Sequence, residues 1–256
     1  MDKATLIGVG GAFGVIFTAN ILEGGNPMAM FLLPPLLLVF GGTLLISLAG
    51  GTLADGISSL KALKRAFLGG AAPAGDVVPV IVDLADKARR EGLLALEDAV
   101  KEVDDEFLVK GVTLAVDGTD PDEVRHILES EVVSKKRTDK QDAKFFGDAG
   151  AYAPTIGIIG TVMGLVHVLE NLAEPEKLGH LIAAAFLATL WGVLSANVIW
   201  LPVSSKLKRL SELEVARMMV VIEGVAAIQA GANPRVVRSR LVSLLPASEQ
   251  EAAEAA

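Results

Sequence analysis

The sequence predicts an all-α membrane protein with four transmembrane helices, a helical cytoplasmic domain between the second and third, and a cytoplasmic helical tail. Apolar residues come in long unbroken blocks, and charged residues fill the gaps between the blocks. Of the 256 residues, 52% are hydrophobic and 21% are charged, whereas a soluble domain carries about 25% charge and disorder requires low hydrophobicity. Solid apolar blocks favour helices over barrel strands, which alternate apolar and polar residues.

Four apolar blocks have the length of a membrane-spanning helix. A bilayer core about 30 Å thick requires roughly 20 apolar residues. None of the blocks contains Asp, Glu, Lys or Arg. The first is longer than the 7–15 apolar residues of a signal peptide, so we expect it to be retained. The four predicted spans are residues 4–22, 31–53, 149–169 and 181–203.

Basic residues predict the orientation of these spans. The segment 54–148 contains fourteen Lys and Arg and the tail after Val203 contains seven, whereas the linkers 23–30 and 170–180 contain only Lys177. The positive-inside rule therefore places both termini and the middle segment in the cytoplasm. The predicted parts are a first transmembrane hairpin (1–53), a cytoplasmic helical domain (54–148), a second transmembrane hairpin (149–203) and a cytoplasmic helical tail (204–256).

The cytoplasmic segment has helical patterning. Apolar residues at helical spacing predict a helix over Val77–Arg90, with Asp76 as its N-cap and Gly92 as its stop. A second helix is expected over Leu93–Leu108. A third opens at Pro121, because proline suits the first helical position, and we expect it to continue into the third span without a break.

The tail is expected to continue the fourth span as a helix from Lys206 to Ile228. Gly231–Pro234 then breaks the helix, and Pro234–Leu245 is predicted to form a short amphipathic helix. The small and acidic end, Ala247–Ala256, is expected to fray.

The usual arrangements of catalytic residues are missing from the sequence. It contains no cysteine, which excludes disulfides and thiol nucleophiles, and no H-E-x-x-H, G-x-S-x-G or P-loop motif. The net charge of −8 gives no basic footprint for nucleic acid. We therefore expect a protein that is not an enzyme, binds no nucleic acid and needs no metal or cofactor.

The predicted spans lack the acidic or basic residue that an ion pathway normally requires. If this chain conducts ions, a partner must supply the carboxylate. His167 lies near the outer end of the third span and suits an interfacial or packing role. The spans offer instead the hydroxyls of Thr161 and Thr189 at mid-membrane depth, which either serve an ion path or bond to the backbone of their own helices.

Two prolines and several small residues also lie in the spans. Pro154 is expected to begin the third helix and Pro202 to end the fourth, both at the cytoplasmic boundary. They act either as helix-end markers or as flex points that couple a membrane event to the cytoplasmic helices. Small residues four apart, which permit close helix packing, are the pairs Gly10/Gly14 and Gly160/Gly164 and the series Ala184, Ala188, Gly192 and Ala196.

Five fragments of the sequence, in order along nearly the full chain, resemble one family. The chain is similar to the MotA/PomA stator subunits of the bacterial flagellar motor, in the MotA/TolQ/ExbB proton channel superfamily. The fragments are Ile21–Pro27 with Phe40–Thr43, Ala88–Glu97, Ala153–Leu165, Ala188–Gly192 with Pro202, and Gly231–Arg235.

The resemblance implies a mechanism and a location. It implies an ion-channel stator subunit in the bacterial inner membrane, with five copies around the two transmembrane helices of a MotB-like partner. That partner would supply the ion-binding aspartate and anchor in peptidoglycan. Ion flow would turn the ring, whose cytoplasmic helices would push on a FliG-like rotor protein. Membrane lipid would surround the ring.

The resemblance assigns a rotor contact to the cytoplasmic segment. Arg89 matches the rotor-facing arginine of the family and Glu97 its rotor-facing glutamate. Arg90 and Glu91 are included as their neighbours. Without the resemblance, all four would be interpreted as an ordinary solvated surface.

The resemblance also assigns roles within the spans. Pro154 and Pro202 match the two prolines that link ion passage to movement, and Thr189 matches a threonine beside the ion path. Thr161 occupies a position where the family has threonine or alanine. Sodium-type relatives tend to add a hydroxyl just before the fourth-helix threonine, and Ala188 stands there instead, which favours protons over sodium as the coupling ion.

Two other functions are compatible with parts of the sequence. A TolQ/ExbB-type energiser of an outer-membrane process usually has three membrane helices, so four spans and the pattern from Arg89 to Glu97 favour the stator. A non-conducting membrane scaffold would explain the small residues but not the paired prolines and hydroxyls.

Overall fold

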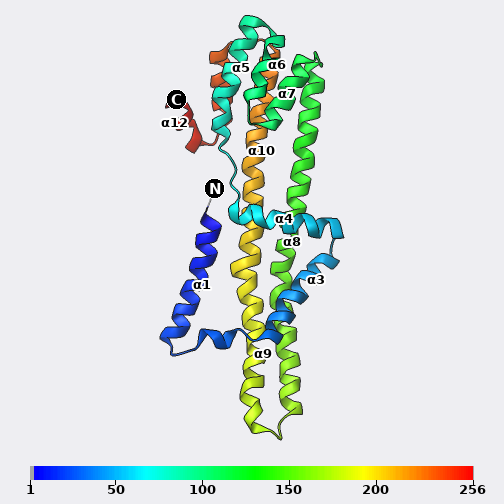
Figure 1. Cartoon of the computed structure of the whole chain (residues 1–256), viewed down its shortest axis with the longest axis vertical. Helices are drawn as coiled ribbons and strands as arrows, with labels where there is room; N and C mark the ends of the chain where they lie inside the picture. The colour runs from blue at the N-terminus through cyan, green and yellow to red at the C-terminus, as the bar shows by residue number, and fades with distance from the viewer. Residues whose placement is uncertain (1–2, 256) are drawn as a thin grey trace. The chain divides into compact units, whose positions relative to one another are not determined.

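A computed structural model describes residues 3–255 (Figure 1), and in this range the regular elements are all helices, joined by turns and loops, without any β-strand. The chain divides into two compact units. Unit 1 comprises Met1–Gly70 and Asp139–Lys208, and unit 2 comprises Ala71–Thr138 and Arg209–Ala256. These units are defined by packing, whereas the predicted segment 54–148 is defined by the membrane boundary.

Two long helical runs contribute to both units. The first is α8 (Pro121–Glu170), a single helix of 50 residues. Its start is fixed by Asp120, whose side chain accepts the backbone N–H of Asp122 at 2.9 Å. The predicted continuity of this helix into the third apolar block is therefore confirmed. The second run consists of α9 (Pro175–Ser195), the π-helical turn η6 (Ala196–Trp200) and α10 (Leu201–Gln229).

Within the described residues 3–255, three helical runs are long and apolar enough to cross a membrane. They are α1 (Ala4–Leu22), α8 and the run from Pro175 to Gln229. Among the residues of helix α1 only Thr5 is buried, and the others are exposed or half-buried. A Cβ atom placed on Gly10 or Gly14 would meet no atom within 4 Å. The glycine pair, which was predicted to pack against another helix, therefore contacts no other helix among residues 3–255.

The second apolar block is helical over a shorter range than predicted. A 3₁₀ turn η1 (Pro27–Met30) precedes it, and the helical residues run from Leu33 to Ala49. The helix therefore begins after residue 31 and ends before residue 53, the limits of the predicted span. At 1.5 Å per residue this helix is about 26 Å long. It is composed of α2 (Leu33–Leu36), the π-helical turn η2 (Leu37–Gly41) and α3 (Gly42–Ala49).

Backbone chemistry explains why the second block ends early. Gly50 and Gly51 follow α3, and Thr52 then begins a separate helix, α4 (Leu53–Leu68), with a capping box. Asp55 accepts the backbone N–H of Thr52 at 3.0 Å, and the Thr52 hydroxyl accepts the N–H of Asp55 at 3.2 Å. The side-chain and backbone hydrogen bonds from Thr52 lower the pKa of Asp55.

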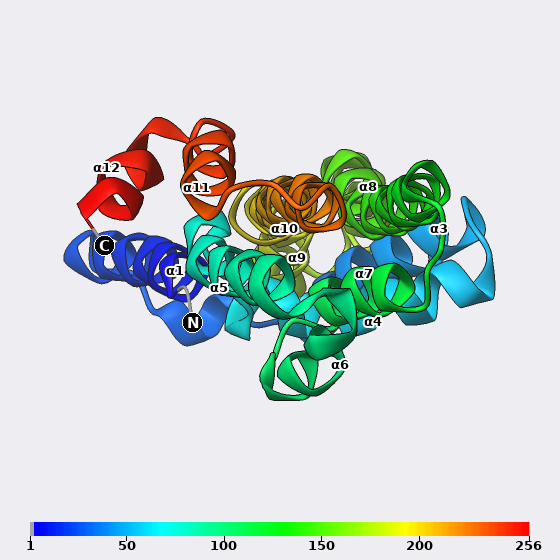
Figure 2. The same ribbon diagram turned by 90° about the horizontal axis from the view of Figure 1, so that it is seen from above.

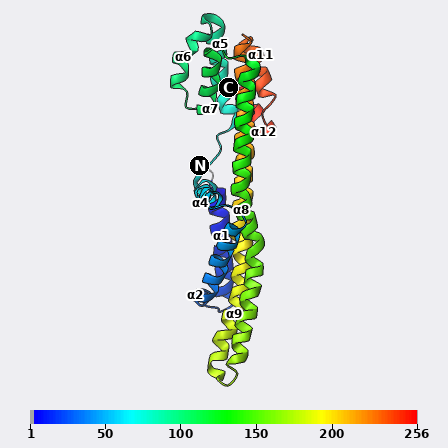
Figure 3. The same cartoon turned by 90° about the vertical axis from the view of Figure 1, so that its right-hand side faces the viewer.

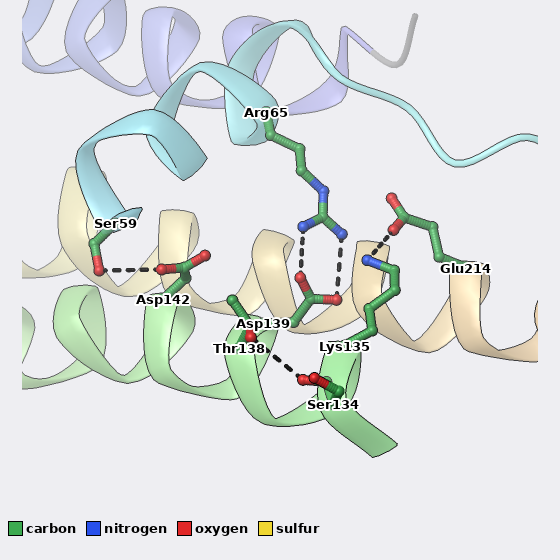
Figure 4. Close-up of polar contacts among 8 residues, drawn as sticks. All are labelled: Ser59, Arg65, Ser134, Lys135, Thr138, Asp139, Asp142 and Glu214. Carbon is green, nitrogen blue, oxygen red and sulfur yellow. Dashed lines mark hydrogen bonds and ion pairs between the residues drawn. The ribbon is translucent and has the colours of Figure 1, made fainter. Parts of the chain in front are cut away.

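Helix α4 runs transverse to the unit 1 part of α8 and is seen almost along its axis in Figure 3. A bidentate ion pair attaches it, because Arg65 Nη1 lies 2.7 Å and Arg65 Nη2 lies 3.4 Å from the two carboxylate oxygens of Asp139 (Figure 4). The Ser59 hydroxyl lies 3.4 Å from a carboxylate oxygen of the buried Asp142. Ala62 and Ala66 pack beside these contacts against Phe146.

Small residues allow α8 and α9 to pack at backbone contact. A Cβ atom on Gly157 would lie 2.7 Å from the carbonyl oxygen of Ala188, and one on Gly192 would lie 2.7 Å from that of Ala153. A Cβ atom on Gly164 would lie 2.6 Å from Ala185 Cβ. The packing role predicted for the small residues of the third and fourth spans is thus confirmed.

Unit 2 is a helical cluster around one apolar core. Helices α5 and α11 lie side by side in it (Figure 2), and the core includes Ile81, Leu108, Leu128 and Leu241. The elements other than α8 and α10 are η3 (Ala74–Asp76), α5 (Val77–Glu91), η4 (Leu93–Ala95), α6 (Leu96–Ala99), η5 (Val100–Glu102), α7 (Glu106–Val116), α11 (Pro234–Val242) and α12 (Ala247–Ala255).

Two expectations for the start of unit 2 are corrected. Asp76 precedes α5, but its side chain makes no capping hydrogen bond, because the residue is already part of the 3₁₀ turn Ala74–Asp76. The predicted stop at Gly92 is confirmed by its φ of +87°. The predicted second helix over Leu93–Leu108 is wrong, because Val103 is extended and Asp105 caps a new helix by accepting the N–H of Leu108 at 2.9 Å.

The tail mostly follows the prediction. The helix after the fourth block ends at Gln229, and Asn233 caps α11 by accepting the N–H of Arg235 at 3.0 Å. Helix α11 ends at Val242, three residues before the predicted Leu245. Residues 247–255 form α12, so the expected fraying of this end stays a prediction, and residue 256 lies outside the described residues. Glu249 anchors this helix by accepting the N–H of Gly75 at 2.8 Å.

The backbone contact between α8 and α9 makes Gly157→Ala destabilising. The added methyl group has no room beside the Ala188 carbonyl, so we expect a loss of about 1–3 kcal/mol. Gly179→Ala in α9 is the matched control, because its Cβ would meet nothing within 4 Å and alanine favours a helix by up to about 1 kcal/mol. Thermal unfolding midpoints of the two variants in one detergent measure this difference, and equal midpoints would contradict the packing.

Candidate functional site

The two predicted threonines meet at the contact between α8 and α9. The hydroxyls of Thr161 and Thr189 hydrogen-bond to each other. The Thr161 hydroxyl also lies 2.9 Å from the carbonyl oxygen of Ala185 and 3.2 Å from that of Gly157. The hydrogen bonds of Thr161 to Thr189 and to Ala185 therefore join α8 to α9, whereas its contact with Gly157 lies within α8. The glycine at position 157 permits this approach because it leaves the space beside Thr189 open.

The threonine pair is half-buried and borders an exposed apolar face. On α8, Ile158 and Leu165 flank Thr161 at helical spacing and are 56% and 43% exposed. On α9, Phe186 and Val193 flank Thr189 and are 63% and 47% exposed. Exposed apolar side chains of this size are typical of a surface that contacts lipid or another helix.

Pro154 lies inside α8, and the helix continues through it, so the prediction that Pro154 begins the third helix is wrong. Because proline has no N–H, the carbonyl of Gly150 loses its regular helical partner. Gly150 itself is buried against Leu201, since a Cβ there would lie 2.6 Å from a Leu201 methyl group.

Pro202 follows Leu201 as the second residue of α10, and the helix continues to Gln229. The prediction that Pro202 ends the fourth helix is therefore wrong. The π-helical turn η6 precedes it. Such turns insert an extra residue into a helix and occur frequently at functional sites. Through the contact of Gly150 with Leu201, the interrupted backbone regions at the two prolines are brought together.

The four predicted rotor-contact residues lie on the surface of unit 2, on both sides of the turn at Gly92. Arg89, Arg90 and Glu91 occupy the end of α5, and Glu97 lies in α6; all four are exposed. Arg90 forms an ion pair with Asp86. Among residues 3–255, the other three have no ion-pair partner, so their charges are free to meet a second protein.

An apolar groove beside Glu97 was not predicted. It is lined by Leu94, Val100, Val109 and Val116 together with Glu97 and Lys101. Leu94 is 75% exposed. The hydrogen bond between Lys101 and Asp98 raises the pKa of Lys101 and lowers the pKa of Asp98. The signal that could have revealed this groove is the exposed apolar Leu94 among charged neighbours, but the groove itself depends on how α6 and α7 pack.

His167 is exposed and contacts Glu170, with 3.3 Å between Nδ1 and a carboxylate oxygen. It lies in the last turn of α8, which suits the interfacial role expected for it. Within residues 3–255, no group of three His, Cys, Asp or Glu side chains could hold a metal ion.

Sequence comparison identifies the family of the chain. Residues 99–219 match the MotA/TolQ/ExbB proton channel family. The chain is 36% identical over 252 residues to Motility protein A of Bacillus subtilis, and the match covers 98% of this chain and 93% of the relative. The chain belongs to the MotA/PomA family. It is also 36% identical to the chemotaxis protein PomA of Vibrio alginolyticus, over 96% of each chain.

The fold of this MotA/PomA chain is similar to that of a solved stator. The match to the flagellar MotAB stator complex of Bacillus subtilis has a TM-score of 0.88 and 35% identity, and it covers 98% of this chain and 99% of that one. The chain is therefore a stator subunit of the flagellar motor and a multi-pass inner membrane protein, and not an enzyme. Similarity over the full length thus favours the stator over a TolQ/ExbB-type energiser or a scaffold.

The hydroxyl pair makes Thr161 and Thr189 energetically coupled. Thr161→Val removes a hydrogen bond between the helices and should cost about 0.5–1.5 kcal/mol of stability. Thr189→Val should cost less in the Thr161→Val background than alone, because the shared bond is already lost. Thr155→Val, at an exposed position of the same helix, is the control. Unfolding midpoints of the single and double variants test this, and strictly additive losses would contradict the coupling.

Proposed function

We propose that five copies of this chain surround the two transmembrane helices of a MotB-like partner, and that ion flow through this complex drives rotation against a FliG-like rotor protein. The observation that carries this proposal is the half-buried pair of Thr161 and Thr189 beside an exposed apolar face of α8 and α9. That face is suited to apolar partner helices. The solved Bacillus subtilis relative is part of a MotAB stator complex, which supports the partner.

The proposed topology has four spans with both termini in the cytoplasm. The spans are Ala4–Leu22, Leu33–Ala49, residues 149–169 and residues 181–203. The second span of about 26 Å is close to the roughly 30 Å hydrocarbon thickness, and local thinning accommodates the difference. The basic residues of segment 54–148 and of the tail support this orientation.

The proposed ion path runs beside the threonine pair, where the partner supplies the aspartate. A proton is favoured as the coupling ion. The hydroxyl oxygens are already bonded to each other and lie next to the backbone carbonyls of Gly157 and Ala185. Ala188 packs on Gly160 and offers no further oxygen. Hard cations prefer several oxygen ligands, so sodium is the second choice, although the threonine at position 161 is compatible with it.

Pro154 and Pro202 are the proposed coupling residues. Each interrupts the backbone hydrogen bonds of a long helix, and the contact of Gly150 with Leu201 places the two interruptions next to each other. Helix α8 and the run from α9 to α10 continue from these points into unit 2. Bending at the prolines therefore provides a route from ion passage to the cytoplasmic helices.

The proposed rotor contact consists of Arg89 and Glu97, with Arg90 and Glu91 beside them. Exposed ion pairs are individually worth about 0.2–1 kcal/mol, so neutralising one charge should only weaken motility. The combined Arg89→Glu and Glu97→Lys variant should stop swimming, because attraction to the rotor becomes repulsion at both positions. The diameter of the swim ring on soft agar measures motility, and an immunoblot of the membrane fraction measures whether the variant is inserted.

The control for this charge reversal is Arg137→Glu combined with Glu102→Lys. Both residues are exposed and lack ion-pair partners among residues 3–255, so this variant makes the same charge changes at other sites of unit 2. It should swim normally. Normal swimming of the Arg89/Glu97 reversal would refute the rotor assignment.

The coupling ion is tested by the rotation speed of tethered cells at fixed pH. Proton coupling predicts that the speed persists without external sodium and collapses when a protonophore is added. A speed that rises from zero with added sodium would reverse the assignment of the ion.

A further inference from the structure

Helix α4 has a second face that the contacts with α8 leave open. Its buried face carries Ser59, Ala62 and Ala66, which pack on α8, while the buried Gly56 faces Leu48 of α3. The exposed face carries large apolar side chains at intervals of three, four and eight residues. Their exposed fractions are 73% for Leu53, 57% for Ile57, 58% for Leu60 and 48% for Leu68.

An apolar groove joins this open face to the second span. It lies between α3 and α4, and almost all of its lining is apolar. Leu45 of α3, which is 68% exposed, lies at the groove with Leu48, Ile57 and Leu60. Phe145 of α8 completes the lining. The groove is therefore continuous with a helix of the apolar block that the family topology places in the membrane.

Two free positive charges border the apolar face. Lys61 and Lys64 are exposed and follow Ile57 and Leu60, respectively, by four residues, so they lie beside these apolar side chains on the open side of the helix. Neither has an ion-pair partner among residues 3–255, whereas Arg65 is occupied by Asp139. The acidic Asp55 of the same helix is bound in the capping box. Lysine side chains can keep their stems on apolar surface while the ammonium reaches a polar headgroup.

We infer that α4 and the groove between α3 and α4 form a binding site for an anionic phospholipid. An acyl chain lies in the apolar groove, and Lys61 and Lys64 bind the headgroup phosphate. The transverse direction of α4 relative to α8 (Figures 1 and 3) fits a helix that lies in the membrane interface, with its apolar face turned to the acyl chains. Only the assignment of this site to the cytoplasmic leaflet rests on the proposed topology.

The test is native mass spectrometry of the full chain in detergent with an equal mixture of phosphatidylglycerol and phosphatidylcholine. We expect phosphatidylglycerol to be retained preferentially. Lys61→Gln combined with Lys64→Gln should lower its affinity by about 10- to 30-fold and leave phosphatidylcholine unaffected. Ile57→Gln combined with Leu60→Gln should lower the retention of both lipids. Soluble glycerol phosphate should displace neither.

The control is Lys136→Gln combined with Arg235→Gln, which removes two exposed basic residues from unit 2 and should leave lipid retention unchanged. Circular dichroism establishes that each variant keeps its helix content. Equal retention of the two lipids by the unmodified chain would overturn the inference, and so would unchanged phosphatidylglycerol retention in the lysine variant. Displacement by glycerol phosphate would show a free-anion site instead. None of these measurements depends on motility, so their failure would leave the proposed stator mechanism untouched.

Discussion

The backbone contact between α8 and α9 is the constraint on which the rest of unit 1 depends. Gly157 and Gly192 bring the two helices so close that each position faces a carbonyl oxygen or α-carbon of the other helix. Without a hydrophobic driving force between helices in lipid, such close packing must hold them together. The same approach brings Thr161 and Thr189 within hydrogen-bonding distance, so the packing of the helices also builds the polar site.

Elsewhere in unit 1, polar side chains attach a transverse helix to α8. Asp139 and Asp142 are among the few buried charged residues, and both face α4. Burying a carboxylate costs free energy unless it is paired, and the two-point contact with Arg65 meets this requirement for Asp139. The position of α4 is thus determined by a few specific bonds on one side, which leaves its other side free for apolar contacts.

The sequence predicts most of the helices because their signals are local. Apolar blocks, Pro121 after Asp120 and Gly92 after a periodic segment all act within a few residues, and the structure follows them. The sequence predicts helix ends at Pro154 and Pro202, but the helices continue through both residues. At Pro154 the reason is physical, because a helix that is packed on both sides of a proline tolerates one lost hydrogen bond. The interruption at Val103 also has a local signal, because Asp105 is a favoured N-cap residue and caps the helix that follows, but the apolar spacing across it favoured one continuous helix.

The candidate site is predictable in part. Residue type and depth point to Thr161 and Thr189, and the small residues indicate close packing, but the mutual hydrogen bond requires the relative rotation of the two helices. The roles of Arg89 and Glu97 come from resemblance alone, because exposed charges have no distinguishing pattern. The groove beside Glu97 and the groove along α4 are products of tertiary packing, which the spacing of residues does not encode.

The unbroken course of α8 also restricts how the gene can change in length. Each residue of an α-helix turns the chain by about 100°, so inserting one codon between Asp139 and Pro154 would rotate Thr161 by about that angle relative to every residue that precedes the insertion. Seven inserted residues would restore the angle to within about 20° while moving the two ends roughly 10 Å apart. Loops elsewhere in the chain can vary in length, whereas the length of this helix fixes both the distance and the rotation between its two ends.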